Sequence, residues 1–176
     1  LHLLSRRQRQ MCIRDSNEED PLCQKLKECL LEQFRILHDE KFVRTFFVGG
    51  ALGVDMWAGE QLLTLRAQTG YEDIKIIVVI PFIGYDSKWP DQSKHRLKKL
   101  IQNANDSIVI SHSADVSSYK KRNYYMVDHA EYIIGVFDNQ KKLRSGTAQT
   151  VNYALHQGKV ITLIHPDTME ITAPAP

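Results

Sequence analysis

The sequence predicts an α/β protein in which helices cover both faces of a doubly wound, mostly parallel sheet. Segments with helical spacing alternate with short apolar segments along most of the chain. The run from Ile74 to Phe82 is apolar and β-branched almost without interruption, as expected of a parallel strand covered on both faces. Right-handed connections between such strands place the helices on the two faces of one open sheet.

Each element follows from a local pattern. Asn17 or Asp20 can cap a first helix that has Pro21 in its first turn, and apolar residues then recur at spacings of three and four up to Leu37. A short strand at 45–48 leads into a helix that starts after Gly53. The remaining pattern predicts strands at 74–82, 107–111, 132–137 and 160–164, and helices at 91–104, 118–130 and 146–156.

The chain of 176 residues is long enough for a single domain with a substantial core. Residues 1–16 have neither helical nor strand periodicity, and RRQRQMCIRDS is similar to the translated sequencing-adapter fragments found at the ends of proteins predicted from metagenome assemblies. We therefore interpret 1–16 as a non-native or disordered tail, 17–166 as the domain and 167–176 as a frayed tail. A genuine basic tail is the alternative for 1–16.

The charge distribution disfavours a nucleic-acid-binding surface. The net charge is +2, but four of the 23 basic and one of the 21 acidic residues lie in 1–16, which leaves 19 basic and 20 acidic residues in the rest of the chain. No apolar run approaches the length that crosses a bilayer, so no membrane association is expected. Three cysteines without metal-ligand spacing and seven scattered histidines favour a cytoplasmic protein with no metal.

The segment FVGGALGVDMWAGE (47–60), which begins at the end of the strand at 45–48, is the most informative motif. Gly49, Gly50 and Gly53 let the backbone turn tightly and approach a ligand, and the helix that follows presents free N–H groups to an anion. The segment matches neither nucleotide-binding pattern G-x-x-x-x-G-K-[ST] nor G-x-G-x-x-G. It predicts a phosphate cradle, with a simple packing turn as the alternative. Asp55 could receive a ribose hydroxyl or balance the helix dipole.

Two later segments add candidate ligand contacts. Arg122 and Asn123 lie in the helical segment RNYYMVD, where an arginine can bind phosphate oxygens with two parallel hydrogen bonds. From spacing alone, a solvated basic face explains Arg122 better. Ser145, Gly146 and Thr147 begin the helix at 146–156 and form a second possible anion site, although they could serve as a helix cap only.

Taken together, GGALGVDMWAGE (49–60), RNYYMVD (122–128) and SGTAQTVNYA (145–154) resemble the YpsA-like proteins of the SLOG superfamily, a group related to the Smf/DprA DNA-processing proteins and the LOG cytokinin-activating hydrolases. The resemblance covers about residues 17–165. It implies a Rossmann-like fold that binds a nucleotide or a nucleotide-derived ligand such as ADP-ribose. A homo-oligomer is compatible with it, and the composition does not decide the oligomeric state.

Two departures from the resemblance bear on function. Members of the group normally begin with a short strand and a TGHRP-like loop, and nothing before Asn17 matches these, so the first strand of the domain is expected to be missing. LOG-type hydrolases have a catalytic glutamate where this chain has Thr150, which cannot act as a general acid or base. The leading hypothesis is therefore nucleotide binding or sensing. A nucleotide hydrolase or transferase using Glu60 or Asp128, and single-stranded DNA binding, are the alternatives.

Overall fold

The computed structural model describes residues 20–112, 114–115, 117–137 and 146–174. Five helices and six strands lie in these ranges. The helices are α2 (Pro21–Lys41), α3 (Val54–Arg66), α4 (Asp91–Asn103), α5 (Ser118–Asp128) and α6 (Gly146–His156). The strands are β1 (Thr45–Val48), β2 (Lys75–Phe82), β3 (Asp106–Ser111), β4 (Tyr132–Val136), β5 (Val160–Ile164) and β6 (Ile171–Thr172).

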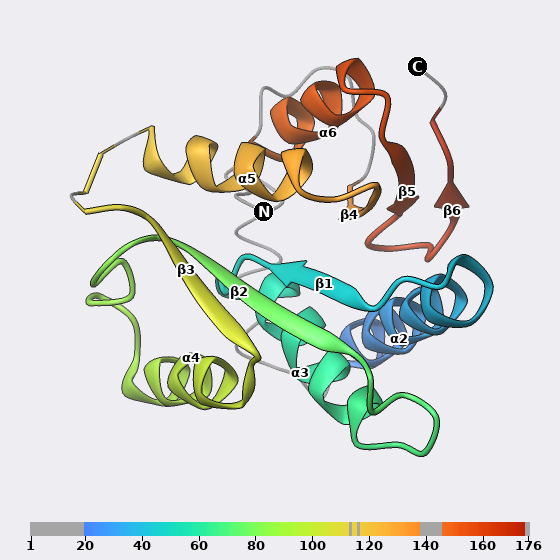
Figure 1. Cartoon of the computed structure of the whole chain (residues 1–176), viewed down its shortest axis with the longest axis horizontal. Coiled ribbons are helices and arrows are strands. Elements are labelled where there is room, and N and C mark those ends of the chain that lie inside the picture. Colours follow the sequence, from blue (N-terminus) through green and yellow to red (C-terminus); the bar gives the residue numbers. More distant parts are fainter. Residues whose placement is uncertain (1–19, 113, 116, 138–145, 175–176) are drawn as a thin grey trace.

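The strands form two separate groups. One sheet has the order β1-β2-β3 with parallel pairing throughout, and the other has the order β4-β5-β6, in which β6 runs antiparallel to β5. Figure 1 shows α2, α3 and α4 on the lower side of the first sheet, and α5 and α6 on its upper side with the second sheet. The fold is therefore α/β and Rossmann-like, as the sequence predicts, with its strands divided between two half-sheets.

Most elements form where the sequence predicts them. The Asp20 carboxylate accepts a hydrogen bond of 2.8 Å from the Leu22 N–H, and Pro21 occupies the first turn of α2. In β2 the side chains of Ile76, Val78 and Val79 are fully buried, which confirms the prediction of a strand covered on both faces. No helix among the described residues is long and apolar enough to cross a membrane.

The C-terminal segment differs from the frayed tail expected at 167–176. Met169 adopts a left-handed backbone conformation with a φ of 60°, and the chain then returns as β6 beside β5. The N–H of His165 donates a hydrogen bond of 2.8 Å to the Glu170 carbonyl, which closes the turn. The tail expectation is wrong for these residues because backbone pairing with an open strand edge does not require a long apolar segment.

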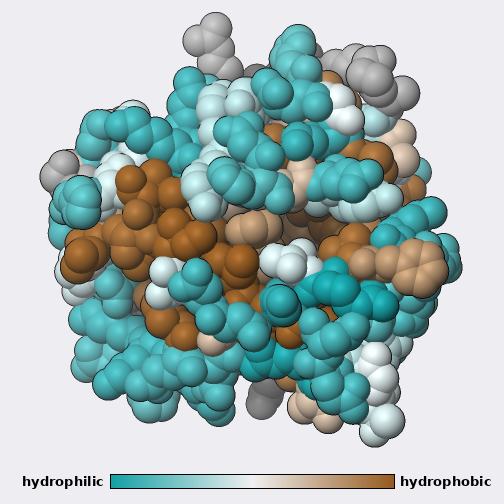
Figure 2. All heavy atoms as spheres, viewed as in Figure 1, coloured by the Kyte–Doolittle hydropathy of each residue, from teal (hydrophilic) through white to brown (hydrophobic). Residues whose placement is uncertain are grey.

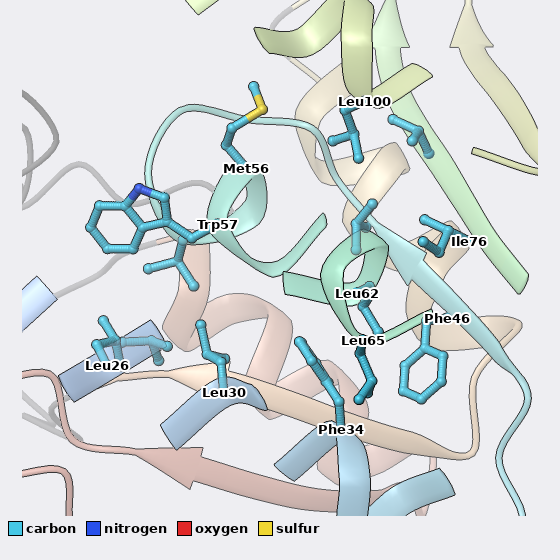
Figure 3. Close-up of a cluster of buried hydrophobic side chains, with 14 of the residues drawn as sticks. Leu26, Leu30, Phe34, Phe46, Met56, Trp57, Leu62, Leu65, Ile76 and Leu100 are labelled. Carbon is cyan, nitrogen blue, oxygen red and sulfur yellow. The ribbon is translucent and has the colours of Figure 1, made fainter. Parts of the chain in front are cut away.

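The main core lies between the first sheet and its lower helices. Figure 3 shows side chains of α2, α3 and α4 converging with those of β1 and β2. Trp57 on α3 is 2% exposed and packs in this core. Gly59 allows α4 to approach closely, since a Cβ on it would lie 2.7 Å from the Leu100 side chain. This packing fixes α3, and with it the glycine-rich turn that precedes α3.

A buried histidine stabilises the edge of the first sheet where β1 and β2 begin. His38, near the end of α2, places Nδ1 2.7 Å from Asp39 and Nε2 2.8 Å from Asp73, and Asp73 also pairs with Arg44. Burial lowers the pKa of His38, but the hydrogen bonds to both carboxylates raise it by more than burial lowers it. The pKa of His38 is therefore raised overall. Protonated His38 therefore joins the end of α2 to the loop before β2.

This cluster predicts a loss of stability at alkaline pH. Because the pKa of His38 is higher in the folded protein, its contribution is complete below its unfolded value of about 6.5 and disappears as the pH rises through the folded value. Urea denaturation at about pH 6 and about pH 9 will measure the difference. His38→Asn is expected to remove most of this pH dependence, and an unchanged dependence in the variant would contradict the assignment.

Candidate functional site

The side chain of Tyr85 holds the glycine-rich turn between β1 and α3 in place. Gly50 and Gly53 have φ values of 61° and 83°, which non-glycine residues rarely adopt. The buried Tyr85 hydroxyl donates a hydrogen bond of 2.8 Å to the Gly50 carbonyl. A Cβ on Gly50 would also lie 3.0 Å from the Tyr85 oxygen. Gly50 and Gly53 thus form the tight turn that the sequence predicts, and Tyr85 orients the Gly50 carbonyl.

Arg122 crosses from α5 to this turn. Its Nη1 donates to the Gly49 carbonyl at 2.6 Å and to the Asp55 carboxylate at 3.1 Å. Gly49 has no room for a side chain, because a Cβ there would lie 1.7 Å from Nη1 of Arg122. Arg122 is fully buried, so the solvated basic face considered for it does not exist. The structure brings Gly49, Asp55 and Arg122 into direct contact.

The guanidinium of Arg122 is only partly satisfied. Within the part of the chain that the structure describes, its Nε and Nη2 are buried without a hydrogen-bond partner. Nε and Nη2 form one edge of the guanidinium, which is the edge that binds a carboxylate or phosphate through two parallel hydrogen bonds. A buried charged donor without a partner is costly, so this edge is a place where a hydrogen-bond acceptor of a ligand would bind favourably.

The Asp55 carboxylate serves the turn and the arginine. It is 9% exposed, and the Ala51 N–H and the Arg122 guanidinium both interact with it. The pKa of Asp55 is lowered; burial acts in the opposite direction, and Arg122 and the Ala51 N–H are among the groups that outweigh it. Asp55 is therefore an ionised partner of Arg122. A ribose contact by Asp55 stays a prediction.

Helices α5 and α6 meet through a polar chain beside the turn. Asn123 Nδ2 donates 3.1 Å to the Thr150 hydroxyl, and that hydroxyl donates 2.8 Å to the Gly146 carbonyl. Thr147, also in the first turn of α6, is 1% exposed, and its hydroxyl has no hydrogen-bond partner within the described ranges. Ser145 lies outside the described residues, so its predicted role stays a prediction.

A cavity of about 450 Å³ lies beside these groups. Gly49, Asp55, Asn123 and Thr150 contribute to its wall, and the rest of the lining is mostly apolar, from α2, α3, α5, β1 and β4. Figure 2, drawn in the same view as Figure 1, shows a hollow between the two groups of strands with apolar side chains inside it. Gly50 and Gly53 are not part of this wall. Three of the sequence-predicted residues, Gly49, Asp55 and Asn123, therefore line this largely apolar cavity, whereas Arg122, Gly146 and Thr147 are not part of its wall.

Several residues considered from the sequence have other partners. Glu60 forms two hydrogen bonds of 2.8 Å and 2.6 Å with Arg96 on α4, and Asp128 accepts one of 2.7 Å from the Tyr153 hydroxyl. Outside the residues considered from the sequence, Tyr85 and Trp89 in the loop after β2 pack edge to face, with ring centroids 5.2 Å apart. The contact of Tyr85 with Gly50 was not predicted, and its only sequence signal is an aromatic residue shortly after β2. No group of three potential metal ligands occurs among the described residues.

Residues 5–169 match the profile of YpsA, described as the YspA SLOG family. The chain belongs to this family. Membership in the SLOG family agrees with the Rossmann-like arrangement of the half-sheets and confirms the resemblance carried by the three motifs.

Individual relatives cover different shares of this SLOG domain. The SPbeta prophage-derived protein YoqJ of Bacillus subtilis is 33% identical over 166 residues, covering 85% of this chain and 92% of the relative. A UPF0398 protein of Staphylococcus epidermidis is 27% identical over 119 residues, covering 66% of this chain and 62% of the relative. The aligned part therefore spans about three fifths of that staphylococcal protein.

The contact between Arg122 and Asp55 predicts that the stability of the protein depends strongly on keeping the two residues paired. Arg122→Met leaves Asp55 ionised and buried without its guanidinium, so we expect a loss of about 3–5 kcal/mol in the free energy of unfolding. Adding Asp55→Asn removes the stranded charge and is expected to restore part of this loss. Urea denaturation of the two single variants and the double variant measures the coupling. Simple additivity of the two single effects would contradict a direct pair.

Proposed function

We propose that the chain binds a nucleotide or a nucleotide-derived ligand, with an anionic group of that ligand held near Arg122 and the starts of α3 and α6. The single observation that carries the proposal is the buried guanidinium edge of Arg122, whose Nε and Nη2 have no partner among the described residues. A phosphate or carboxylate oxygen pair fits such an edge in charge and in geometry. Family membership supports the same class of ligand.

The helix starts add donors of the right kind. Gly53 precedes α3 and supplies no side-chain cap, and the buried Thr147 hydroxyl lies in the first turn of α6 without a partner in the described part of the chain. N–H groups in the first turn of a helix favour an anion through hydrogen bonding and through the helix dipole. The apolar remainder of the cavity wall suits the base of a nucleotide better than a highly charged polymer.

The proposal is limited to binding. Thr150 stands where LOG-type hydrolases have a catalytic glutamate, and its hydroxyl is already hydrogen-bonded to Asn123 and Gly146. Asp55, whose carboxylate contributes to the cavity wall, is the partner of Arg122. Glu60 is held by Arg96 on the side of α3 that faces α4. None of these groups is placed as a free general acid or base.

Isothermal titration calorimetry of the full chain against AMP, ADP-ribose, NAD and cyclic nucleotides tests the proposal. We expect heat of binding and an increase in the thermal midpoint for at least one of these compounds. Nucleosides without phosphate serve as the control and are expected to bind more weakly. Equal affinity for nucleosides and nucleotides would contradict the role of Arg122, and absence of heat with every compound would contradict the proposal as a whole.

Two threonine variants on α6 separate binding from stability. Thr147→Val removes a hydroxyl without a partner and keeps the shape, so we expect unchanged stability and about tenfold or more loss of nucleotide affinity. Thr150→Val removes the hydroxyl that joins Asn123 to Gly146, so we expect a loss of about 1–3 kcal/mol in stability. Calorimetry and urea denaturation of both variants give the comparison, and unchanged affinity in Thr147→Val would rule out this contact.

A further inference from the structure

The strand β3 lies at the outer edge of the first sheet and lacks the features that usually prevent an edge strand from pairing with another chain. Among the described strands it pairs only with β2, in one constant register. It is six residues long and contains neither lysine nor proline, whereas β6, at the outer edge of the second sheet, has two residues. Edge strands are normally kept short, charged, or interrupted by proline or a bulge. The edge of β3 is therefore open to a partner strand.

The middle of β3 is apolar and only partly covered. None of its residues is buried: Val109 is 40% exposed, and Ile108 and Ile110 are half-buried. Ile83, shortly after the end of β2, is 73% exposed. Figure 2 shows apolar side chains gathered on the part of the face where Figure 1 places β3 and the end of β2. A partner strand at this edge would remove apolar surface from water.

The sequence of this edge reads the same in both directions. Residues 107–111 are Ser-Ile-Val-Ile-Ser, a palindrome centred on Val109. When two copies of β3 pair antiparallel about a twofold axis at Val109, every residue of the palindrome therefore lies opposite its own kind. Ile108 lies opposite Ile110 of the partner subunit, and this pair occurs twice. Directly opposed β-branched side chains stabilise antiparallel strands.

The residues that flank the palindrome also match across the same axis. Asp106 lies opposite His112 of the partner subunit, once on each side of the axis, and both residues are exposed. A carboxylate opposite an imidazole is a favourable cross-strand pair, whereas two like charges would repel. A register shifted by two residues would instead place Asp106 opposite Ile110 of the partner subunit. The side chains thus favour the register that is centred on Val109.

The backbone of β3 is oriented for this pairing. The Ser107 N–H donates a hydrogen bond of 2.7 Å to the Asp106 carboxylate and so belongs to the groups on the free edge. Because backbone groups alternate in direction along a strand, those of Val109 and Ser111 point to the same edge. In the twofold arrangement the N–H and C=O of Val109 meet those of the same residue in the other copy, which forms a hydrogen-bonded pair.

We propose that the chain forms a homodimer in which β3 pairs antiparallel with β3 of a second copy, about a twofold axis at Val109. The first sheets of the two copies then form one sheet with the order β1-β2-β3-β3-β2-β1. A second copy fits this edge better than an unrelated extended peptide, because a palindrome with opposite end groups is complementary to itself. The inference does not depend on the nucleotide proposal, since no residue of β3 contributes to the cavity wall.

Sedimentation velocity of the full chain, at concentrations on the order of 1–100 µM, tests for the dimer. We expect a reversible equilibrium between monomer and dimer. Val109→Lys places two lysines opposite each other and is expected to weaken the dimer about tenfold or more. Val160→Lys makes the same change at a valine of β5 that is 52% exposed, and is expected to leave the dimer unchanged. The thermal midpoint by circular dichroism checks that both variants fold.

A chain that stays monomeric over the whole range would overturn the proposal. Equal dimerisation of the wild type and Val109→Lys would also overturn it, and so would equal weakening by the two lysine substitutions. Any association that depends on other parts of the chain is recognised in this way, because it persists in Val109→Lys.

An exchange of the flanking groups tests the register. Asp106→Lys and His112→Asp are each expected to weaken the dimer about threefold or more, because each places groups of like charge type opposite each other. Both substitutions in one chain recreate an oppositely charged pair across the axis, so we expect association to recover toward that of the wild type. Additive weakening in the double variant would overturn the proposed pairing.

Discussion

The fold around the cavity depends on one buried ion pair. Arg122 comes from α5, Asp55 from the first turn of α3, and Gly49 from the end of β1, and a single guanidinium nitrogen bonds the last two. Because a charge without a partner is strongly unfavourable in the interior, the arginine determines how close α5 lies to the turn. Gly49 must also lack a side chain, because the Arg122 guanidinium occupies the space where a Cβ of Gly49 would lie.

Helix α5 also connects the two groups of strands. Its Arg122 reaches the first group, and the neighbouring Asn123 reaches Thr150 on α6, which packs with the second group. Adjacent positions on one helix therefore bind the two halves in different directions. The apolar space between β1 and β4 lies directly beside this polar link. An ordered polar end and an apolar interior in one cavity are a suitable combination for a ligand with a charged and a flat apolar part.

The sequence predicted the elements because each leaves a local pattern. The apolar run of β2, the Asp20-Pro21 start of α2 and the glycines before α3 are all visible in short windows. The role of Arg122 was not predicted from spacing, because Lys120 and Lys121 beside it are exposed and its partners lie 67 and 73 residues away. The division into half-sheets and the pairing of β6 are likewise long-range, and no local window contains them.

The arrangement of the half-sheets has a consequence for the order of assembly. The strands β1, β2 and β3 with α2, α3 and α4 come from one uninterrupted part of the chain, and β4, β5 and β6 with α5 and α6 come from the part that follows. Contacts within contiguous segments require little loop closure. During synthesis, the amino-terminal sheet can therefore complete its hydrogen bonding and its core before the carboxyl-terminal sheet has left the ribosome.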